Sequence, residues 1–123
     1  MTAAIRLSLP FPPTVNNLYA NRGARGGRYK TAAYKAWEQL AGVAIKDGHR
    51  QGIVIYSLAV ALRRPDRRAR DLGNYEKALS DLLVSHGVVA DDSGCERLSM
   101  QWDHGMKEDC VVLVMPAEEA MAA

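Results

Sequence analysis

The segment Ile53-Val54-Ile55-Tyr56-Ser57-Leu58-Ala59-Val60-Ala61-Leu62 is the most strand-like part of this chain. It is apolar almost throughout, which is typical of a central strand that is covered on both faces. Before it, the spacing of apolar residues predicts a helix that is capped by Thr31 and runs to about residue 45. After it, similar spacing predicts a helix over residues 72–85 that is closed by Gly87.

Three further strands are predicted from local patterns. Residues 5–9 and 98–102 alternate apolar and polar side chains, and residues 110–115 are apolar and β-branched. The loop 104–109 is expected to join the last two strands as a hairpin. The order β-α-β-α-β-β predicts an α/β (α+β-like) fold, a single small domain with its helices packed on a mixed sheet. The domain is expected to cover residues 1–116, followed by a short, disordered acidic tail over 117–123.

Composition narrows the class of protein. A chain of 123 residues suits one domain, and 48% apolar with 24% charged residues is ordinary for a soluble globular protein. No apolar run approaches the roughly 20 residues that a membrane span needs, and no signal-peptide pattern is present, so we expect a cytoplasmic protein without a membrane partner. Cys95 and Cys110 are isolated, which favours free thiols over a disulfide or a zinc site.

The net charge of +2 hides an uneven distribution. Residues 1–90 hold fourteen Lys/Arg against six Asp/Glu, whereas residues 91–123 hold two against eight. A basic body suits a polyanionic partner, although an unevenly charged solvated surface remains an alternative. The glycine-rich segment 21–30 lacks the ending of a P-loop and is expected to be a mobile basic loop. The predicted phosphate contacts are Arg63, Arg64, Arg67, Arg68 and Arg70 after the central strand, and Arg25, Arg28 and Lys30 in the loop.

Carboxylates, an amide and a lysine follow the arginine run within twenty-two residues: Asp71, Asn74, Lys77, Asp91 and Asp92. Aspartates bind Mg²⁺, which prefers oxygen ligands and lowers the pKa of its bound water. A nearby lysine stabilises developing negative charge. Each residue also has a structural explanation: a helix cap, an exposed Lys77–Asp81 pair or a turn. Together with the arginines, they predict metal-dependent cleavage of nucleic acid.

The same residues resemble the signature of a known family. Pro65-Asp66-Arg67-Arg68-Ala69-Arg70-Asp71-Leu72-Gly73-Asn74-Tyr75-Glu76-Lys77-Ala78, then Asp81 and Gly87-Val88-Val89-Ala90-Asp91-Asp92, look like those of the RusA family of small Holliday-junction resolvases, often carried by prophages. Residues 9–17 are similar to that family's opening segment, and the resemblance covers roughly residues 5–115. It implies a homodimer that nicks branched DNA, a four-way junction, symmetrically with Mg²⁺ or Mn²⁺ in recombination and repair.

The resemblance also implies roles for individual residues. Asp71 and Asp92 match the first and last metal-binding aspartates, with Asp91 beside the latter, and Lys77 matches the catalytic lysine. Asn74 matches the asparagine of the family's Asp-x-Asp-Asn. The second aspartate of that motif is Gly73 here, which lowers the expected metal affinity. The leading prediction is therefore a junction endonuclease, the alternative is a junction-binding protein that cuts poorly or not at all, and a third option is a basic protein that binds RNA or a protein partner.

Overall fold

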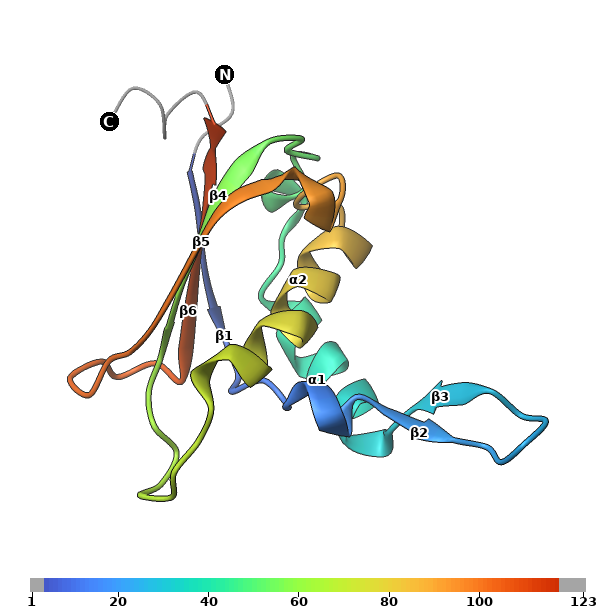
Figure 1. Cartoon of the computed structure of the whole chain (residues 1–123). Coiled ribbons are helices and arrows are strands. Elements are labelled where there is room, and N and C mark those ends of the chain that lie inside the picture. Colours follow the sequence, from blue (N-terminus) through green and yellow to red (C-terminus); the bar gives the residue numbers. More distant parts are fainter. Residues whose placement is uncertain (1–3, 118–123) are drawn as a thin grey trace.

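The segment predicted as the central strand lies inside a four-stranded mixed sheet, in a computed structural model that describes residues 4–117. Strand β4 (Tyr56–Leu62) pairs antiparallel with β6 (Cys110–Pro116) on one side and parallel with β5 (Cys95–Trp102) on the other. Strand β1 (Ile5–Leu9) pairs antiparallel with β6, which gives the order β1-β6-β4-β5 (Figure 1). The expected α/β class, with a mixed sheet in a single small domain, is confirmed.

The expected hairpin between the last two strands is wrong. Strand β4 lies between β5 and β6, so the loop after Trp102 crosses the end of β4 instead of making a tight turn. This crossing is fixed by two backbone hydrogen bonds: Asp103 N donates to Leu62 O at 2.8 Å, and Arg63 N donates to Asp109 O at 3.0 Å. Local alternation predicts strands but carries no information about which strands pair.

Both predicted helices are present and cover one face of the sheet (Figure 1). Helix α1 (Ala32–Val43) begins as expected at Thr31, whose side chain accepts a hydrogen bond from Tyr34 N. Helix α2 (Glu76–Ser85) is preceded by a 3₁₀ turn, η3 (Leu72–Tyr75), so the predicted first turn is helical but not α-helical. Gly87 closes α2 with a φ of 72°, a left-handed conformation that favours glycine.

The core lies between this helical layer and the inner face of the sheet. Alternate residues of β4 are buried, while those between them are half-buried. Within one chain, β4 is therefore fully covered on only one face, whereas the sequence predicted cover on both. Helix α2 contributes the fully buried Leu79, Leu82 and Leu83. Burial of each such leucine stabilises the fold by roughly 1.5–3 kcal/mol. This packing fixes α2, and with it the polar residues on the other side of the helix.

The glycine-rich basic segment forms most of a hairpin, and its mobility stays a prediction. Strands β2 (Tyr19–Asn21) and β3 (Arg28–Lys30) pair antiparallel and project from the body of the molecule (Figure 1). Gly23 and Gly27 adopt φ values of 96° and 64°, which side chains rarely allow, so the glycines make the turn. The remaining short turns are η1 (Val15–Asn17), η2 (Asp47–His49) and η4 (Asp92–Gly94).

Two further expectations concern the acidic tail and membrane-spanning helices. Strand β6 ends at Pro116, and the predicted acidic tail lies, apart from Ala117, outside the described residues. Within the described part of the chain, no helix is long and apolar enough to cross a membrane.

Candidate functional site

The turn that carries Asp91 and Asp92 is anchored to the start of β4. Ile53 forms an isolated parallel bridge with Val89, and Ala90 N donates to Ile53 O at 2.9 Å. The Tyr56 hydroxyl then donates to the backbone oxygen of Asp91 at 3.2 Å. The sequence predicted that Ile53 belongs to the central strand, but β4 begins only at Tyr56. The bridge of Ile53 instead holds the segment that leads into the two aspartates.

Gly94 allows this turn to approach the sheet closely. A Cβ at this position would lie 1.8 Å from the Val54 carbonyl oxygen, far inside van der Waals contact. Any side chain would therefore push the turn away from the strand. Because β5 begins at the next residue, Gly94 fixes the two aspartates at the amino end of β5.

The carboxylate of Asp91 accepts hydrogen bonds from within its own turn. Asp91 caps η4, and its carboxylate accepts hydrogen bonds from the backbone N–H of Ser93 at 3.2 Å and from the Ser93 hydroxyl. These bonds favour the ionised form and hold the pKa of Asp91 below its usual value. The turn explanation is thus confirmed for Asp91. It does not exclude a second role, because a carboxylate has about four lone-pair sites.

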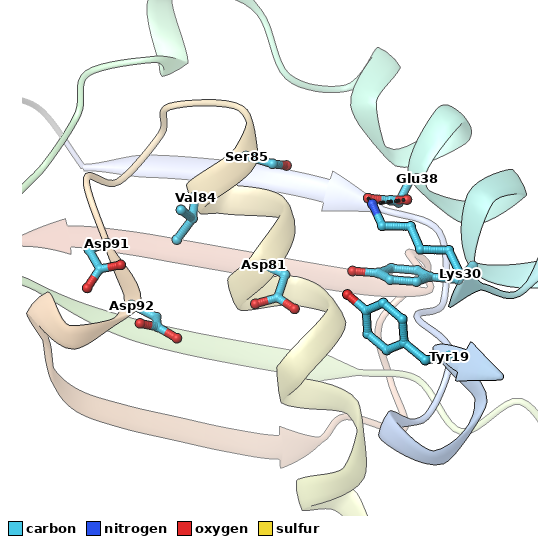
Figure 2. Close-up of a pocket in the computed structure, with 9 residues that line it drawn as sticks. Tyr19, Lys30, Glu38, Asp81, Val84, Ser85, Asp91 and Asp92 are labelled. Carbon is cyan, nitrogen blue, oxygen red and sulfur yellow. Dashed lines mark hydrogen bonds and ion pairs between the residues drawn. The ribbon is translucent and has the colours of Figure 1, made fainter. Parts of the chain in front are cut away.

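Asp91 and Asp92 face a pocket of about 280 Å³ between the two helices, the turn and the basic hairpin (Figure 2). Helix α2 contributes Asp81 to this pocket, and Lys30 Nζ lies 3.0 Å from both carboxylate oxygens of Glu38 on α1. We call this space the acidic pocket; its polar lining residues are Asp81, Asp91, Asp92, Glu38, Lys30, Tyr19, Tyr34 and Ser85. Four carboxylates against one lysine give it a negative balance.

Lys77 borders the acidic pocket through Asp81. Its Nζ lies 3.1 Å from Asp81 Oδ1, one helical turn further along α2. The pKa of Lys77 is raised, first by this hydrogen bond and then by the charges of Asp81 and Asp92. The predicted i,i+4 pair is therefore present, and Lys77 also lies within the field of Asp92.

Asp71 does not reach the acidic pocket. Its carboxylate accepts a hydrogen bond from Gly73 N at 3.2 Å and caps η3, at the end of α2 opposite to the turn. The ten residues of α2 alone span about 15 Å. Asn74 lies in the same 3₁₀ turn and donates its backbone N–H to Asp71 O at 3.1 Å. One chain therefore brings Asp91 and Asp92 together with Asp81, but not with Asp71.

This arrangement limits how one chain can hold a metal ion. Among residues 4–117, no three His, Cys, Asp or Glu side chains converge on a common metal position. Mg²⁺ nevertheless often takes only one or two carboxylates, with waters and substrate phosphates as its other ligands. The oxygen donors of the acidic pocket suit that mode of binding.

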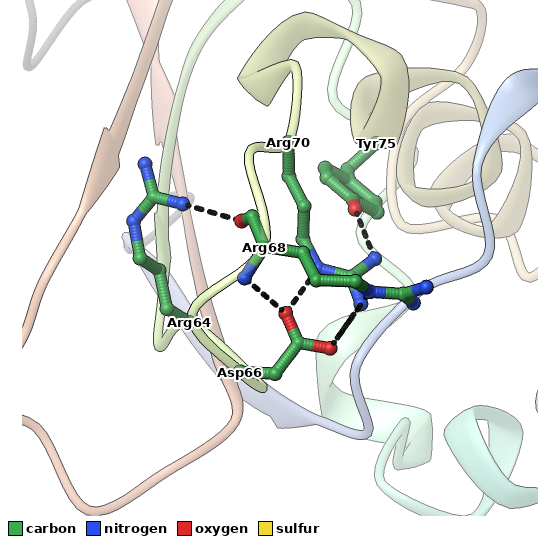
Figure 3. A network of polar contacts seen from close by, with 5 residues as sticks. All are labelled: Arg64, Asp66, Arg68, Arg70 and Tyr75. Atoms are coloured by element: carbon green, nitrogen blue, oxygen red, sulfur yellow. Dashed lines mark hydrogen bonds and ion pairs between the residues drawn. The ribbon is translucent and has the colours of Figure 1, made fainter.

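The arginine run folds around its own aspartate (Figure 3). Asp66 binds the Arg70 guanidinium in a bidentate ion pair and also accepts the backbone N–H of Arg68 at 3.0 Å. Arg70 Nη1 continues to the Tyr75 hydroxyl at 3.2 Å. The hydrogen bond from Arg70 is the main reason that the pKa of Asp66 falls to about 2. Arg70 therefore orders the loop rather than pointing freely into solvent.

The other arginines of the run divide into two groups. Arg63 pairs with Asp109 at 2.8 Å, and Arg64 lies over the Trp102 ring with its guanidinium carbon 4.5 Å from the ring centroid. Arg67 is exposed and has no ion pair with any described residue. The side chain of Arg68 is 78% exposed, although its Nε lies 3.4 Å from Asp66 Oδ2. Arg67 and Arg68 are thus the most accessible cations of the loop.

Sequence reasoning missed several residues of these sites. Glu38, Tyr19 and Tyr34 line the acidic pocket. The spacing of Tyr34 and Glu38, one turn apart on a predicted helix, was the available signal. The ion pair of Asp66 with Arg70 was also not predicted, although their spacing of four residues is the signal for it.

Fold and site together define a small mixed-sheet protein with a carboxylate pocket, an ordered arginine loop and a basic hairpin, as expected of a protein that acts on nucleic acid. The family model described as endodeoxyribonuclease RusA matches residues 10–112. The crossover junction endodeoxyribonuclease RusA of Escherichia coli strain K12 is 33% identical over 89 residues, 71% of this chain and 72% of its own length. The enzymes of the same name from Shigella sonnei and Enterobacteria phage 82 have the same identity and the same coverage. The chain belongs to the RusA family, which confirms the resemblance in the sequence.

Proposed function

We propose that this protein is a metal-dependent endonuclease that resolves four-way DNA junctions by paired nicks. Membership of the RusA family supports the reaction, because the relatives are named as crossover junction endodeoxyribonucleases. The structural observation that carries the proposal is that Asp92 and Asp81 line one pocket, and that Lys77 binds Asp81 at 3.1 Å at its edge. A carboxylate and a charged lysine at one concave site suit the cleavage of a phosphodiester.

The residues of this chain divide the work. Asp92, with Asp91 beside it, would hold Mg²⁺ or Mn²⁺, which when bound activates water and neutralises phosphate charge. The Lys77 ammonium, kept protonated by Asp81 and Asp92, faces charge that develops on the cleaved phosphate. Arg67 and Arg68 contact the backbone of the bound DNA, and Arg63, Arg64 and Arg70 hold their loop in shape. The backbone N–H of Asn74 donates to Asp71 O at 3.1 Å and so helps to hold the turn that carries Asp71.

A homodimer belongs to this proposal. Two symmetric nicks need two equivalent sites, which a twofold dimer provides. A dimer also offers a route for Asp71 to act. The distance along α2 separates it from Asp92 in one chain, but the Asp71 of a second protomer is free of that limit.

The alternative is a junction-binding protein that cuts poorly. Two observations favour it: Gly73 replaces a carboxylate of the family motif, and no three potential metal ligands converge in the described part of the chain. Both leave the basic loop and hairpin intact, so binding would survive without efficient cutting.

A cleavage assay separates these functions. A labelled synthetic four-way junction is incubated with the native protein, Asp92→Asn and Asp47→Asn, in Mg²⁺ and in Mn²⁺. Asp47 is a fully exposed aspartate outside the acidic pocket and serves as the control. We expect the native chain and Asp47→Asn to cut, and Asp92→Asn to bind without cutting. Tight junction binding without cutting by the native chain supports the alternative. Equal affinity for the junction and a linear duplex at moderate salt would contradict both.

A further inference from the structure

The β2–β3 hairpin is a strongly basic element that projects from the body of the molecule (Figure 1). Residues 19–30 contain Arg22, Arg25, Arg28 and Lys30 and no Asp or Glu. The three arginines are exposed, and the hairpin extends away from the sheet and both helices (Figure 1). Because residues 21–29 are all exposed, the three arginines are open to a charged partner.

The arginines of the hairpin are ordered without being neutralised. The Arg22 guanidinium lies 5.2 Å from the centre of the Tyr29 ring, and that of Arg28 lies 4.6 Å from the centre of the Tyr19 ring. Stacking on an aromatic face holds a guanidinium while its N–H groups stay available at the edge. Among the described residues, none of the three hairpin arginines has an ion pair, unlike Arg63 and Arg70 of the arginine loop.

The base of the hairpin is fixed at the edge of the acidic pocket. Lys30 binds both oxygens of Glu38 at 3.0 Å, and Thr31 N donates to Leu18 O at 3.0 Å. Tyr19 and Lys30 also line the pocket itself (Figure 2). Lys30 thus anchors the hairpin. We therefore assign the phosphate contacts of the hairpin to its three arginines and not to Lys30.

We propose that the β2–β3 hairpin lies in a groove of one duplex arm of the DNA and grips the backbone of the strand that enters the acidic pocket. A two-stranded β-ribbon matches the major groove, which is about 12 Å wide. Guanidinium edges suit phosphate oxygens, and contacts of this kind set the register of the DNA without reading its sequence. The inference rests on the proposed function and assigns the position of the duplex relative to the pocket.

The first test compares two variants of equal charge. One carries Arg22→Gln, Arg25→Gln and Arg28→Gln, and the control carries Lys35→Gln, Lys46→Gln and Arg50→Gln, all exposed positions outside the hairpin. Junction affinity is measured across a salt series. We expect the hairpin variant to bind more weakly and its salt slope to fall by about 2.7, or about 0.9 for each lost phosphate contact. The control is expected to keep a slope close to that of the native chain.

The second test does not depend on affinity. A photocrosslinker is attached to Ala24→Cys in the hairpin turn and, as control, to Ala33→Cys on the exposed side of α1. We expect crosslinks from position 24 at a fixed distance from the cut on one junction arm, and few from position 33. Hairpin variants that match their controls in both tests, with native cutting intact, would overturn the inference and leave the proposed function standing. A native chain that neither binds nor cuts junctions would overturn both.

Discussion

Gly73 lies two residues after Asp71, at the position that the sequence resemblance assigns to the second aspartate of the motif. A Cβ at Gly73 would meet only Asp71 Oδ1, at 3.7 Å, and the residue does not adopt a left-handed conformation. An aspartate fits there without strain and would place two carboxylates side by side. We expect Gly73→Asp to raise Mg²⁺-dependent cleavage by roughly tenfold or more, since even outer-shell partners of metal ligands change affinity by about 10–100-fold. Junction affinity, measured in Ca²⁺, should change little.

Gly73→Asn is the matched control for this prediction. It adds nearly the same shape without a charge, and it removes the same glycine from the 3₁₀ turn. If Asn raises cleavage as much as Asp does, the gain comes from a more rigid turn and not from an added metal ligand.

Arg67 and Arg70 should behave differently although both belong to the same basic run. Arg67 is exposed, so Arg67→Gln should lower the salt slope of DNA binding by about 0.9 and leave the melting temperature unchanged. Arg70 is held by Asp66 and Tyr75, so Arg70→Gln should speed amide hydrogen exchange across residues 63–70. Exchange that stays as slow as in the native chain would show that the Asp66–Arg70 pair does not order the loop.

At the scale of elements, the sequence predicts what depends on local pattern. The spacing of apolar residues locates α1 and α2, and Thr31 and Gly87 mark a start and an end because their capping needs only neighbouring residues. Strand partners are not local. The insertion of β4 between β5 and β6 depends on the α2 crossover, which no alternation of side chains encodes.

A central and an edge position on the same face of the sheet, in β4 and β5, provide a test of the core. Leu58 is 1% exposed in β4, and its direct cross-strand neighbour in β5, Leu98, is 48% exposed. We expect Leu58→Ala to lower the free energy of unfolding by about 2–5 kcal/mol through lost burial and a cavity. Leu98→Ala should cost less than about 1 kcal/mol. Urea denaturation measures both, and similar losses would mean that β5 is covered on this side in solution.

At the scale of the whole molecule, the buried acids of the core predict weaker folding at high pH. Burial raises the pKa of the Cys110 thiol and of the Tyr56 hydroxyl to about 12 each, and raises that of Tyr34 as well. Unfolding restores values near 9 for Cys and 10 for Tyr, so above pH 9 the unfolded chain binds fewer protons than the folded one. Stability should therefore fall as pH rises from 9 to 12, whereas these groups add no pH dependence at neutral pH.

The urea midpoint at pH 7.5, 9.0 and 10.5 checks this expectation. Cys110→Ala removes one of the groups and should make the decline between pH 9.0 and 10.5 shallower than in the native chain. A midpoint that is constant or rises over this range would contradict the expectation that these side chains stay buried and protonated.

The candidate site is also a property of the whole molecule, which explains why the sequence predicted it only in part. Asp91 and Asp92 are neighbours in the chain, and Asp81 joins them because α2 runs toward the turn that holds them. Asp71 belongs to the same short motif as Lys77, yet it lies at the far end of the helix from the turn. The shared site was predicted on the expectation that helix and turn bring Asp71 and Asp92 to one edge, but the length of α2 keeps them apart in one chain.

Mixing two inactive variants tests whether a dimer reunites them. Asp71→Asn and Asp92→Asn should each abolish cleavage alone. In a mixed dimer, a site built from the Asp71 of one protomer and the Asp92 of the other is intact once, so the mixture should regain single-strand nicking without paired cuts. If each site lies within one chain, both sites of the mixed dimer lack a carboxylate and the mixture stays inactive. Light scattering shows whether dimers form, and co-refolding before the assay ensures that the protomers exchange. The outcome decides between one chain and two as the unit that assembles the catalytic carboxylates.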